Sequence, residues 1–288
     1  MENYIEKILN AFKSKNALKN IQENPEETTA GKIPKKRPKI DKTFDIPKTI
    51  EIMPIRVDKF DGLIKDGGLE RGSTTLISGG TGTGKTTFAL QSMYYSALKG
   101  EKGIFISFEE EPAKIKQHML KNFGWDFYKL EKQGVFAFLK LDPAKIARTV
   151  EGKIAEKSGS LKIKIQNIEL PFKPDRICLD SLSALSIAFE DEDNYRKYIR
   201  ELFEFLESYN SVNLVIAETQ QNPKIYSKTG VEEFLADAVV VLYNVKHEGF
   251  RKNALEILKL RSSEHVKKMV PYKIGSSGIE INTDKNKF

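Results

Sequence analysis

Residues 79–86 read Gly-Gly-Thr-Gly-Thr-Gly-Lys-Thr and match the pattern G-x-x-x-x-G-K-[ST] in full. A strand-like run, residues 73–78, precedes them, and a helical pattern follows from Thr87. Glycines let backbone N–H groups turn around a phosphate without a Cβ in the way. The order strand, loop, helix therefore predicts a phosphate-binding loop (residues 79–86), where the helix N-terminus adds positive charge.

Individual residues of this loop have distinct predicted roles. Lys85 supplies a mobile charge for the β- and γ-phosphates and so takes part in any catalysis, and the Thr86 hydroxyl is a ligand for Mg²⁺. The loop predicts binding of a nucleoside triphosphate, whereas hydrolysis needs further groups. The predicted nucleotide-binding residues are Gly79, Gly80, Thr81, Gly82, Thr83, Gly84, Lys85, Thr86 and Thr87.

The composition is that of a soluble globular protein, with 288 residues, 40% hydrophobic and 30% charged. No apolar run approaches the roughly 18–20 residues of a membrane span, and the first residues lack the order of a secretion signal. We therefore expect a cytoplasmic protein without membrane contact. The single cysteine, Cys178, excludes a disulfide framework and a cysteine metal site. A net charge of +7 permits a nucleic-acid partner but does not require one.

Residues 1–50 differ from the rest of the chain. Residues 4–22 predict an amphipathic helix followed by a flexible basic linker that contains Lys35-Lys36-Arg37. The apolar stripe of this helix would pack on a partner protein, a neighbouring subunit or the chain's own core. We expect a single folded domain over residues 51–288, which the resemblance described below implies is an ATPase domain. The stripe consists of Ile5, Ile8, Leu9 and Phe12.

From about residue 55, apolar strand candidates alternate with helices, which predicts an α/β fold with a mostly parallel central sheet and helices on both faces. The last strands follow one another without helices and predict an antiparallel C-terminal extension. Residues 161–168 alternate apolar and polar side chains, as in an edge hairpin or a subunit contact. Strands are expected over 75–78, 103–108, 135–140, 176–180, 213–218, 238–243, 254–259, 268–274 and 279–281, and helices over 86–99, 112–123, 143–155 and 193–209.

Two strand ends carry carboxylates suited to hydrolysis. Asp180 ends the apolar run 176–180 and is predicted to orient Mg²⁺ through its waters. Glu109 and Glu110 end the strand that follows the loop helix, and a right-handed crossover brings that end to the nucleotide. Either could activate the attacking water. The alternative is that these acids cap the helix near Pro112, a role that suits Glu111 best.

The last group of candidate residues is a basic strand edge. Lys259 and Arg261 share one face of a strand, and His265 and Lys267 follow it. Such an edge could reach a neighbouring subunit's nucleotide as an arginine finger does, or it could be a solvated basic rim.

Together these residues resemble the KaiC family, a branch of the RecA-like P-loop ATPases, and in particular its single-domain archaeal type. The resemblance is specific because three features occur together: the Phe-Glu-Glu pair, the Gly-Val-Glu-Glu-Phe segment and the Lys-x-Arg edge. One departure is Ser262-Ser263-Glu264, which stands where the family commonly has Gly-Thr-Ser. The motifs that carry the resemblance lie at 67–73, 79–87, 108–112, 123–126, 174–181, 230–234 and 258–265.

The resemblance implies Mg²⁺-dependent ATP hydrolysis by a homo-oligomer, commonly a hexamer, that couples turnover to a conformational or assembly change. It assigns Glu109 and Glu110 as the catalytic pair and Thr86 with Asp180 to the Mg²⁺. A RecA- or RadA-like DNA-dependent ATPase and an ATP-binding switch or scaffold with little hydrolysis are the alternatives. Autokinase activity is less expected, because the chain carries one such domain. The residues implied to contact ATP across a subunit interface are Lys259, Arg261 and His265.

Overall fold

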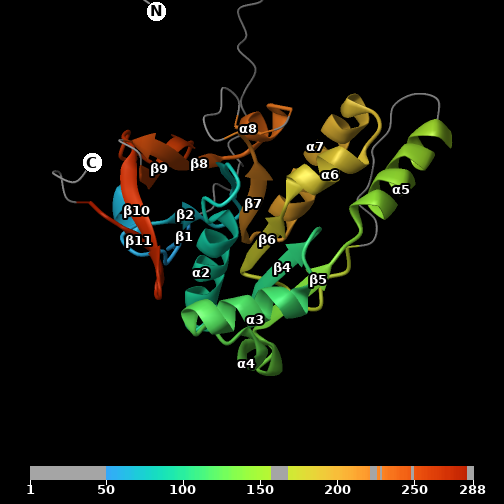
Figure 1. The fold of residues 1–288 in the computed structure, drawn as a ribbon. Helices are drawn as coiled ribbons and strands as arrows, with labels where there is room; N and C mark the ends of the chain where they lie inside the picture. The colour runs from blue at the N-terminus through green and yellow to red at the C-terminus, as the bar shows by residue number, and fades with distance from the viewer. Residues whose placement is uncertain (1–49, 157–167, 221–225, 228, 248–249, 284–288) are drawn as a thin grey trace, which may run out of the picture. The chain divides into compact units, whose positions relative to one another are not determined.

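The computed structural model describes residues 50–156, 168–220, 226–227, 229–247 and 250–283 (Figure 1). By its internal contacts the chain divides into Met1–Lys48 and Thr49–Phe288, and the described residues all belong to the second unit. The predicted N-terminal helix and linker, and nearly all of the strand predicted over 161–168, lie outside the described residues. The division into residues 1–50 and 51–288 therefore stays a prediction.

The described residues form a nine-stranded sheet in the order β11-β10-β9-β8-β3-β7-β6-β4-β5. The strands from β8 to β5 run parallel, and β9, β10 and β11 continue the sheet in antiparallel fashion. The predicted fold class is confirmed. The strands are β3 (Thr74–Gly79), β4 (Gly103–Ser107), β5 (Phe136–Lys140), β6 (Arg176–Asp180), β7 (Val212–Glu218), β8 (Ala238–His247), β9 (Phe250–Leu260), β10 (Val270–Gly275) and β11 (Gly278–Ile281), with β1 (Ile52–Met53) and β2 (Leu69–Glu70) as a separate pair.

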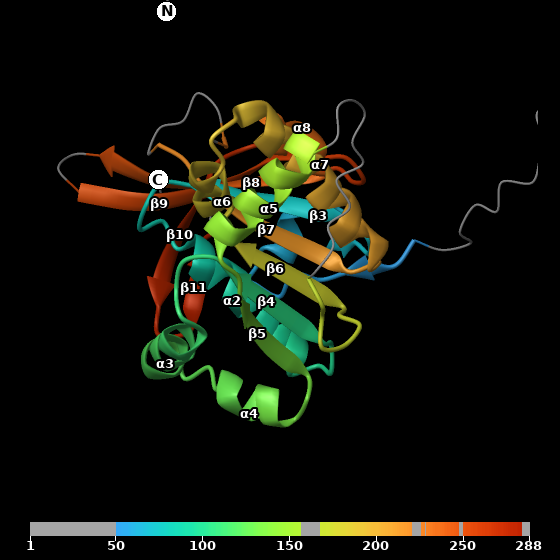
Figure 2. The ribbon, with the colours of Figure 1, turned by 90° about the vertical axis from the view of Figure 1, so that its right-hand side faces the viewer.

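Helices cover both faces of the sheet, as expected for parallel strands that are apolar on both sides. Figure 2 shows α3 and α4 on one side of the strands and α5, α6 and α7 on the other. No helix in the described part of the chain is long and apolar enough to cross a membrane. The helices are α2 (Lys85–Ala97), α3 (Pro112–Phe123), α4 (Phe127–Lys132), α5 (Pro143–Glu156), α6 (Leu182–Ala188), α7 (Glu192–Ser208) and α8 (Val231–Leu235), with a short 3₁₀ turn over Asp61–Leu63.

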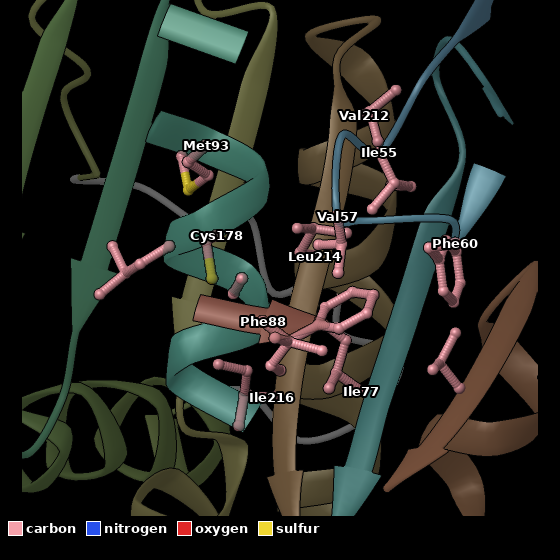
Figure 3. Packing of buried hydrophobic residues seen from close by; sticks show 14 of the residues in the cluster. Ile55, Val57, Phe60, Ile77, Phe88, Met93, Cys178, Val212, Leu214 and Ile216 are labelled. Atoms are coloured by element: carbon pink, nitrogen blue, oxygen red, sulfur yellow. The ribbon is translucent and has the colours of Figure 1, made fainter. Parts of the chain in front are cut away.

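Two apolar clusters, one on each face of the sheet, hold these layers together. On the α2 face, Phe88 packs beside Ile77 and Ile216 (Figure 3). Cys178 is fully buried in the same cluster, where it packs as a small apolar residue. On the other face, α7 buries a stripe at helical spacing against the strands. Its buried members are Tyr195, Tyr198, Ile199, Leu202, Phe203 and Leu206.

Candidate nucleotide-binding site

The carboxyl ends of β3, β7, β6 and β4 lie side by side at one edge of the sheet. In register, Gly79 lies beside Glu218, and Ser107 lies beside Asp180. Ligands of open parallel sheets bind outside the carboxyl ends of the strands. This edge is therefore the candidate site.

The phosphate-binding loop has a backbone shape that glycine makes possible. A Cβ at Gly79 would lie 2.4 Å from the carbonyl oxygen of Leu242 and 2.9 Å from the Thr83 hydroxyl, so a side chain does not fit there. Gly84 is the N-cap of α2 and has a φ of +87°, a conformation that side chains rarely adopt. Inside the loop, the Thr83 hydroxyl donates to the Gly80 carbonyl oxygen at 2.8 Å. The loop is thus closed on itself.

Lys85 lies within this closed loop and is only 7% exposed. Its Nζ donates to the Gly80 carbonyl oxygen at 3.1 Å and is 3.7 Å from Oε1 of Glu218. Burial lowers the pKa of Lys85, and nearby carboxylates oppose that effect. The Lys85 ammonium group is therefore buried among carboxylates. The carboxylates that act on it are Glu218, Asp180 and Glu109.

Thr86 and Asp180 form the side of the site that would hold a metal. The Thr86 hydroxyl donates to Oδ2 of Asp180 at 2.7 Å, and burial raises the pKa of Asp180 to about 6. These two oxygens are hard ligands of the kind that Mg²⁺ prefers, and the ion would offset the charge of the buried carboxylate. The described residues contain no group of three or more side chains able to hold a metal ion.

The two adjacent glutamates after β4 point to different partners. Oε1 of Glu109 accepts a hydrogen bond of 2.8 Å from the hydroxyl of Ser181, directly after Asp180. Oε1 of Glu110 instead lies 3.6 Å from Nδ1 of His118 and 3.8 Å from Nζ of Lys114, both on α3. The structure therefore brings Glu109 to the metal-side carboxylate and turns the side chain of Glu110 towards α3.

A tight turn sets these orientations. The Ser107 hydroxyl donates to the Glu110 carbonyl oxygen at 2.6 Å and accepts from the Glu110 N–H at 3.1 Å. Glu111 occupies the N-cap of α3 but makes no side-chain capping hydrogen bond, and its carboxylate lies 3.9 Å from Nζ of Lys140. Glu111 therefore stands at the cap position that the sequence predicted for it, although its side chain makes no hydrogen bond to the free amides of the helix.

The sequence profile of a family described as "ATPase: KaiC" matches residues 53–286. The chain belongs to the KaiC family of ATPases. It is 34% identical over 233 residues to circadian clock protein KaiC3 of Synechocystis, covering 81% of this chain and 46% of that relative. It is 36% identical over 222 residues to the circadian clock oscillator protein KaiC of Parathermosynechococcus lividus, covering 76% and 40%. The chain thus spans less than half the length of these two relatives.

A solved structure of a KaiC-like protein from the hyperthermophilic archaeon Pyrococcus horikoshii OT3 also matches. The two folds agree with a TM-score of 0.67 at 30% sequence identity, over 81% of this chain and 100% of the archaeal chain. This match in fold and sequence confirms the predicted resemblance to a single-domain KaiC-like ATPase of the RecA superfamily.

In this KaiC-family chain, the basic residues at the end of β9 hold the end of α8. Nζ of Lys259 donates to the carbonyl oxygens of Ala236 at 2.6 Å and Glu233 at 2.9 Å. Nη2 of Arg261 donates to the Phe234 carbonyl oxygen at 2.7 Å. Both cations therefore satisfy carbonyl groups that a helix C-terminus leaves without partners.

This basic pair and the phosphate-binding loop lie at opposite edges of the sheet. The Arg261 N–H donates to the Asp237 carbonyl oxygen, and the Asp237 N–H donates to that of Thr74, the first residue of β3. The loop follows Gly79, at the other end of β3. The chain therefore does not bring Lys259 and Arg261 to its own loop.

His265 lies near Arg261 in the KaiC domain. It forms a β-bridge with Ile64, and its Nδ1 is buried without a hydrogen-bond partner in the described part of the chain. Together with Lys65, Arg261 and Lys267, it lines an open cavity of about 710 Å³. Asp66 and Glu264 also line this cavity, and Glu264 lies 3.2 Å from Nζ of Lys65, so acids offset much of the positive charge there.

Two residues of the site were not predicted from the sequence. Glu218 ends β7 and faces Lys85, and Ser181 holds Glu109. Glu218 ends an apolar strand just as Asp180 does, and that pattern is the signal that could have identified it. Ser181 carried no signal of its own, because its role depends on the neighbouring strand.

Proposed function

We propose that this KaiC-family chain binds ATP with Mg²⁺ at the phosphate-binding loop and hydrolyses it to ADP and phosphate. The observation that supports this most strongly is the meeting of the loop with two carboxylates, Asp180 and Glu109, at one edge of the sheet. A site for binding alone would not need the second carboxylate.

The residues divide the work between binding and chemistry. Backbone amides of the loop and the Lys85 ammonium hold the phosphates, and the Thr86 and Asp180 oxygens hold Mg²⁺. The ion would offset charge on the phosphate oxygens as the terminal phosphoryl group leaves. Glu109, held by Ser181, orients the attacking water and accepts its proton.

Glu109 rather than Glu110 is the better candidate for this base. The Glu109 carboxylate contributes to the electrostatics of both Lys85 and Asp180. The Glu110 carboxylate instead faces Lys114 and His118 on α3, on the side away from Ser181 and Asp180 that Glu109 approaches. We assign Glu110 to holding the turn that presents Glu109.

Lys259, Arg261 and His265 would complete the nucleotide site of a second copy of the chain. The distance of Lys259 and Arg261 from the chain's own loop and the positive charge of these two side chains support that assignment. The chain would then act as a homo-oligomer that couples turnover to a change in conformation or assembly. A mass measurement with and without ATP, with Lys85→Ala as the variant that should not respond, tests whether nucleotide promotes assembly.

The catalytic assignment is tested with two matched variants. Glu109→Gln should bind ATP like the unaltered protein but release phosphate about 10²–10⁴ times more slowly, the usual contribution of a general base. Glu110→Gln changes the neighbouring residue in the same way and should keep most of the rate. Phosphate release and binding of a fluorescent ATP analogue are measured in parallel. Equal rates in both variants and the unaltered protein would remove Glu109 from the mechanism.

A further inference from the structure

The C-terminal hairpin of β10 and β11 contacts the phosphate-binding loop directly. The hydroxyl of Tyr272 on β10 donates a hydrogen bond to the carbonyl oxygen of Thr83. Tyr272 is 5% exposed and Thr83 is fully buried, so neither group can exchange its partner for water. The Thr83 hydroxyl in turn holds Gly80. One side chain of the hairpin thus acts on the middle of the loop.

The same hairpin also covers the turn from the loop into α2. A Cβ at Gly84 would lie 2.7 Å from Cδ1 of Ile274 on β10. Gly84 is the N-cap of α2, so Ile274 lies against the point at which the helix amides open towards a phosphate. A displacement of β10 would therefore be transmitted to this turn.

A third contact fixes the hairpin to the body of α2. The Gln91 side chain is 3% exposed and pairs with both backbone groups of Ile279 on β11. Its Nε2 donates to the Ile279 carbonyl oxygen at 3.1 Å, and its Oε1 accepts from the Ile279 N–H at 2.7 Å. The hairpin and α2 are thereby joined as one unit, which also carries the loop (Figures 1 and 2 show β11 beside α2).

We propose that the β10–β11 hairpin fixes the conformation of the phosphate-binding loop, with Tyr272 as the positioning residue, and so sets the loop's affinity for nucleotide. A loop held in its binding conformation loses less conformational freedom when it binds, which strengthens binding. Without the Tyr272 hydroxyl, the Thr83 carbonyl oxygen loses its partner in a buried place, and the loop gains other conformations. The effect on nucleotide rests on the proposed function, whereas the effect on the loop does not.

The test compares two substitutions that each remove one buried tyrosine hydroxyl. Tyr272→Phe removes the bond to the loop. Tyr195→Phe is the matched control, because its hydroxyl donates to Glu232 at 2.7 Å in the apolar cluster on the other face of the sheet. Tyr272→Phe should weaken binding of a fluorescent ATP analogue about three- to tenfold, the usual effect of one hydrogen bond, and speed its dissociation. Tyr195→Phe should lower the unfolding temperature without changing the affinity.

A second measurement needs no nucleotide. Amide hydrogen exchange of residues 80–86 in the empty protein should be faster in Tyr272→Phe than in the unaltered protein, and unchanged in Tyr195→Phe. If the unaltered protein does not bind ATP, the proposed function fails while the exchange result still tests the hairpin. Loop exchange in Tyr272→Phe equal to that in the unaltered protein would overturn the proposal, as would equal nucleotide affinities in a protein that binds ATP.

Discussion

Asp180 is a residue at which the stability of the fold and the proposed function make opposite demands. Its carboxyl group ends a buried strand, and burial raises its pKa from 3.8 to about 6 despite the hydrogen bond from Thr86. The charges of Glu109 and Glu218 raise it further, while that of Lys85 lowers it. Without a bound cation, the ionised form of this side chain is therefore less stable in the folded protein than in water.

The first prediction concerns the stability of Asp180→Asn in the absence of metal. Between pH 3.8 and about 6 the folded protein holds a proton that the unfolded chain has lost, so stability falls as pH rises through this range and stays reduced above it. Asparagine cannot ionise. In urea unfolding with a chelator, the variant should exceed the unaltered protein near neutral pH by up to about 3 kcal/mol. The difference should disappear at about pH 3, below the ordinary pKa of the carboxyl group, and an advantage that is the same at both pH values would contradict this origin.

At the scale of elements, a buried ion network joins the start of β6 to the segments packed beneath it. Nε of Arg176 lies 2.6 Å from Oε2 of Glu101, and Nη2 of Arg56 lies 2.6 Å from Oε1 of the same carboxylate. Arg176 is 1% exposed and also donates to the Pro54 carbonyl oxygen. One carboxylate therefore pairs with two guanidinium groups at the amino end of the sheet, and the nearby charge of Asp61 also acts on both arginines.

Glu101→Gln should accordingly destabilise the fold by about 3–5 kcal/mol, because it takes the paired carboxylate away from the buried guanidinium group of Arg176. Glu51→Gln is the matched control. It breaks a pair of 2.7 Å with Arg71 in which the glutamate side chain is 61% exposed, and should cost less than about 1 kcal/mol. Urea unfolding compares the two. Equal losses of unfolding free energy would mean that the network contributes no more than a surface pair. Nucleotide affinity should be unchanged in both folded variants.

The strands were predictable from the sequence because parallel strands covered on both faces are continuous apolar runs. The run at 176–180 was expected with the bounds that β6 has, and the antiparallel extension was expected because no helices separate its strands. The short helices α4, α6 and α8 were not predicted. With five to seven residues each, they are too short to show a helical period.

The sequence predicted the site residues that belong to a recognisable motif. It was less informative about residues that reach the site only because of the order of the strands in the sheet. Glu218 has the same pattern as Asp180, but only the placement of β7 next to β3 brings it to Lys85. The sequence also leaves Glu109 and Glu110 equivalent. The turn closed by Ser107 separates their directions, and that turn depends on hydrogen bonds rather than on a periodic pattern.

At the scale of the whole molecule, the basic pair and the loop lie at opposite ends of β3, so the shared site proposed above would need two copies of the chain. Lys259 and Arg261 lie level with the start of β3, while the loop follows its end. If the loop end of one copy packs against the basic end of a second copy, the loop of the first meets the cations of the second. The chain's own sheet prevents the same meeting within one copy.

Such a shared site predicts that two defective variants restore each other when mixed. Glu109→Gln removes the base beside the loop, and Arg261→Ala removes a cation of the opposite edge, so each alone should release little phosphate. In an equimolar mixed homo-oligomer, about one quarter of the interfaces pair an intact loop with an intact basic edge, and phosphate release should recover to about that fraction. Mixing Glu109→Gln with Lys85→Ala is the control, because both changes lie on the loop side and no interface regains a complete loop. Recovery in neither mixture, under conditions in which mass measurement shows that the subunits exchange, would mean that Arg261 does not act on a second copy's nucleotide.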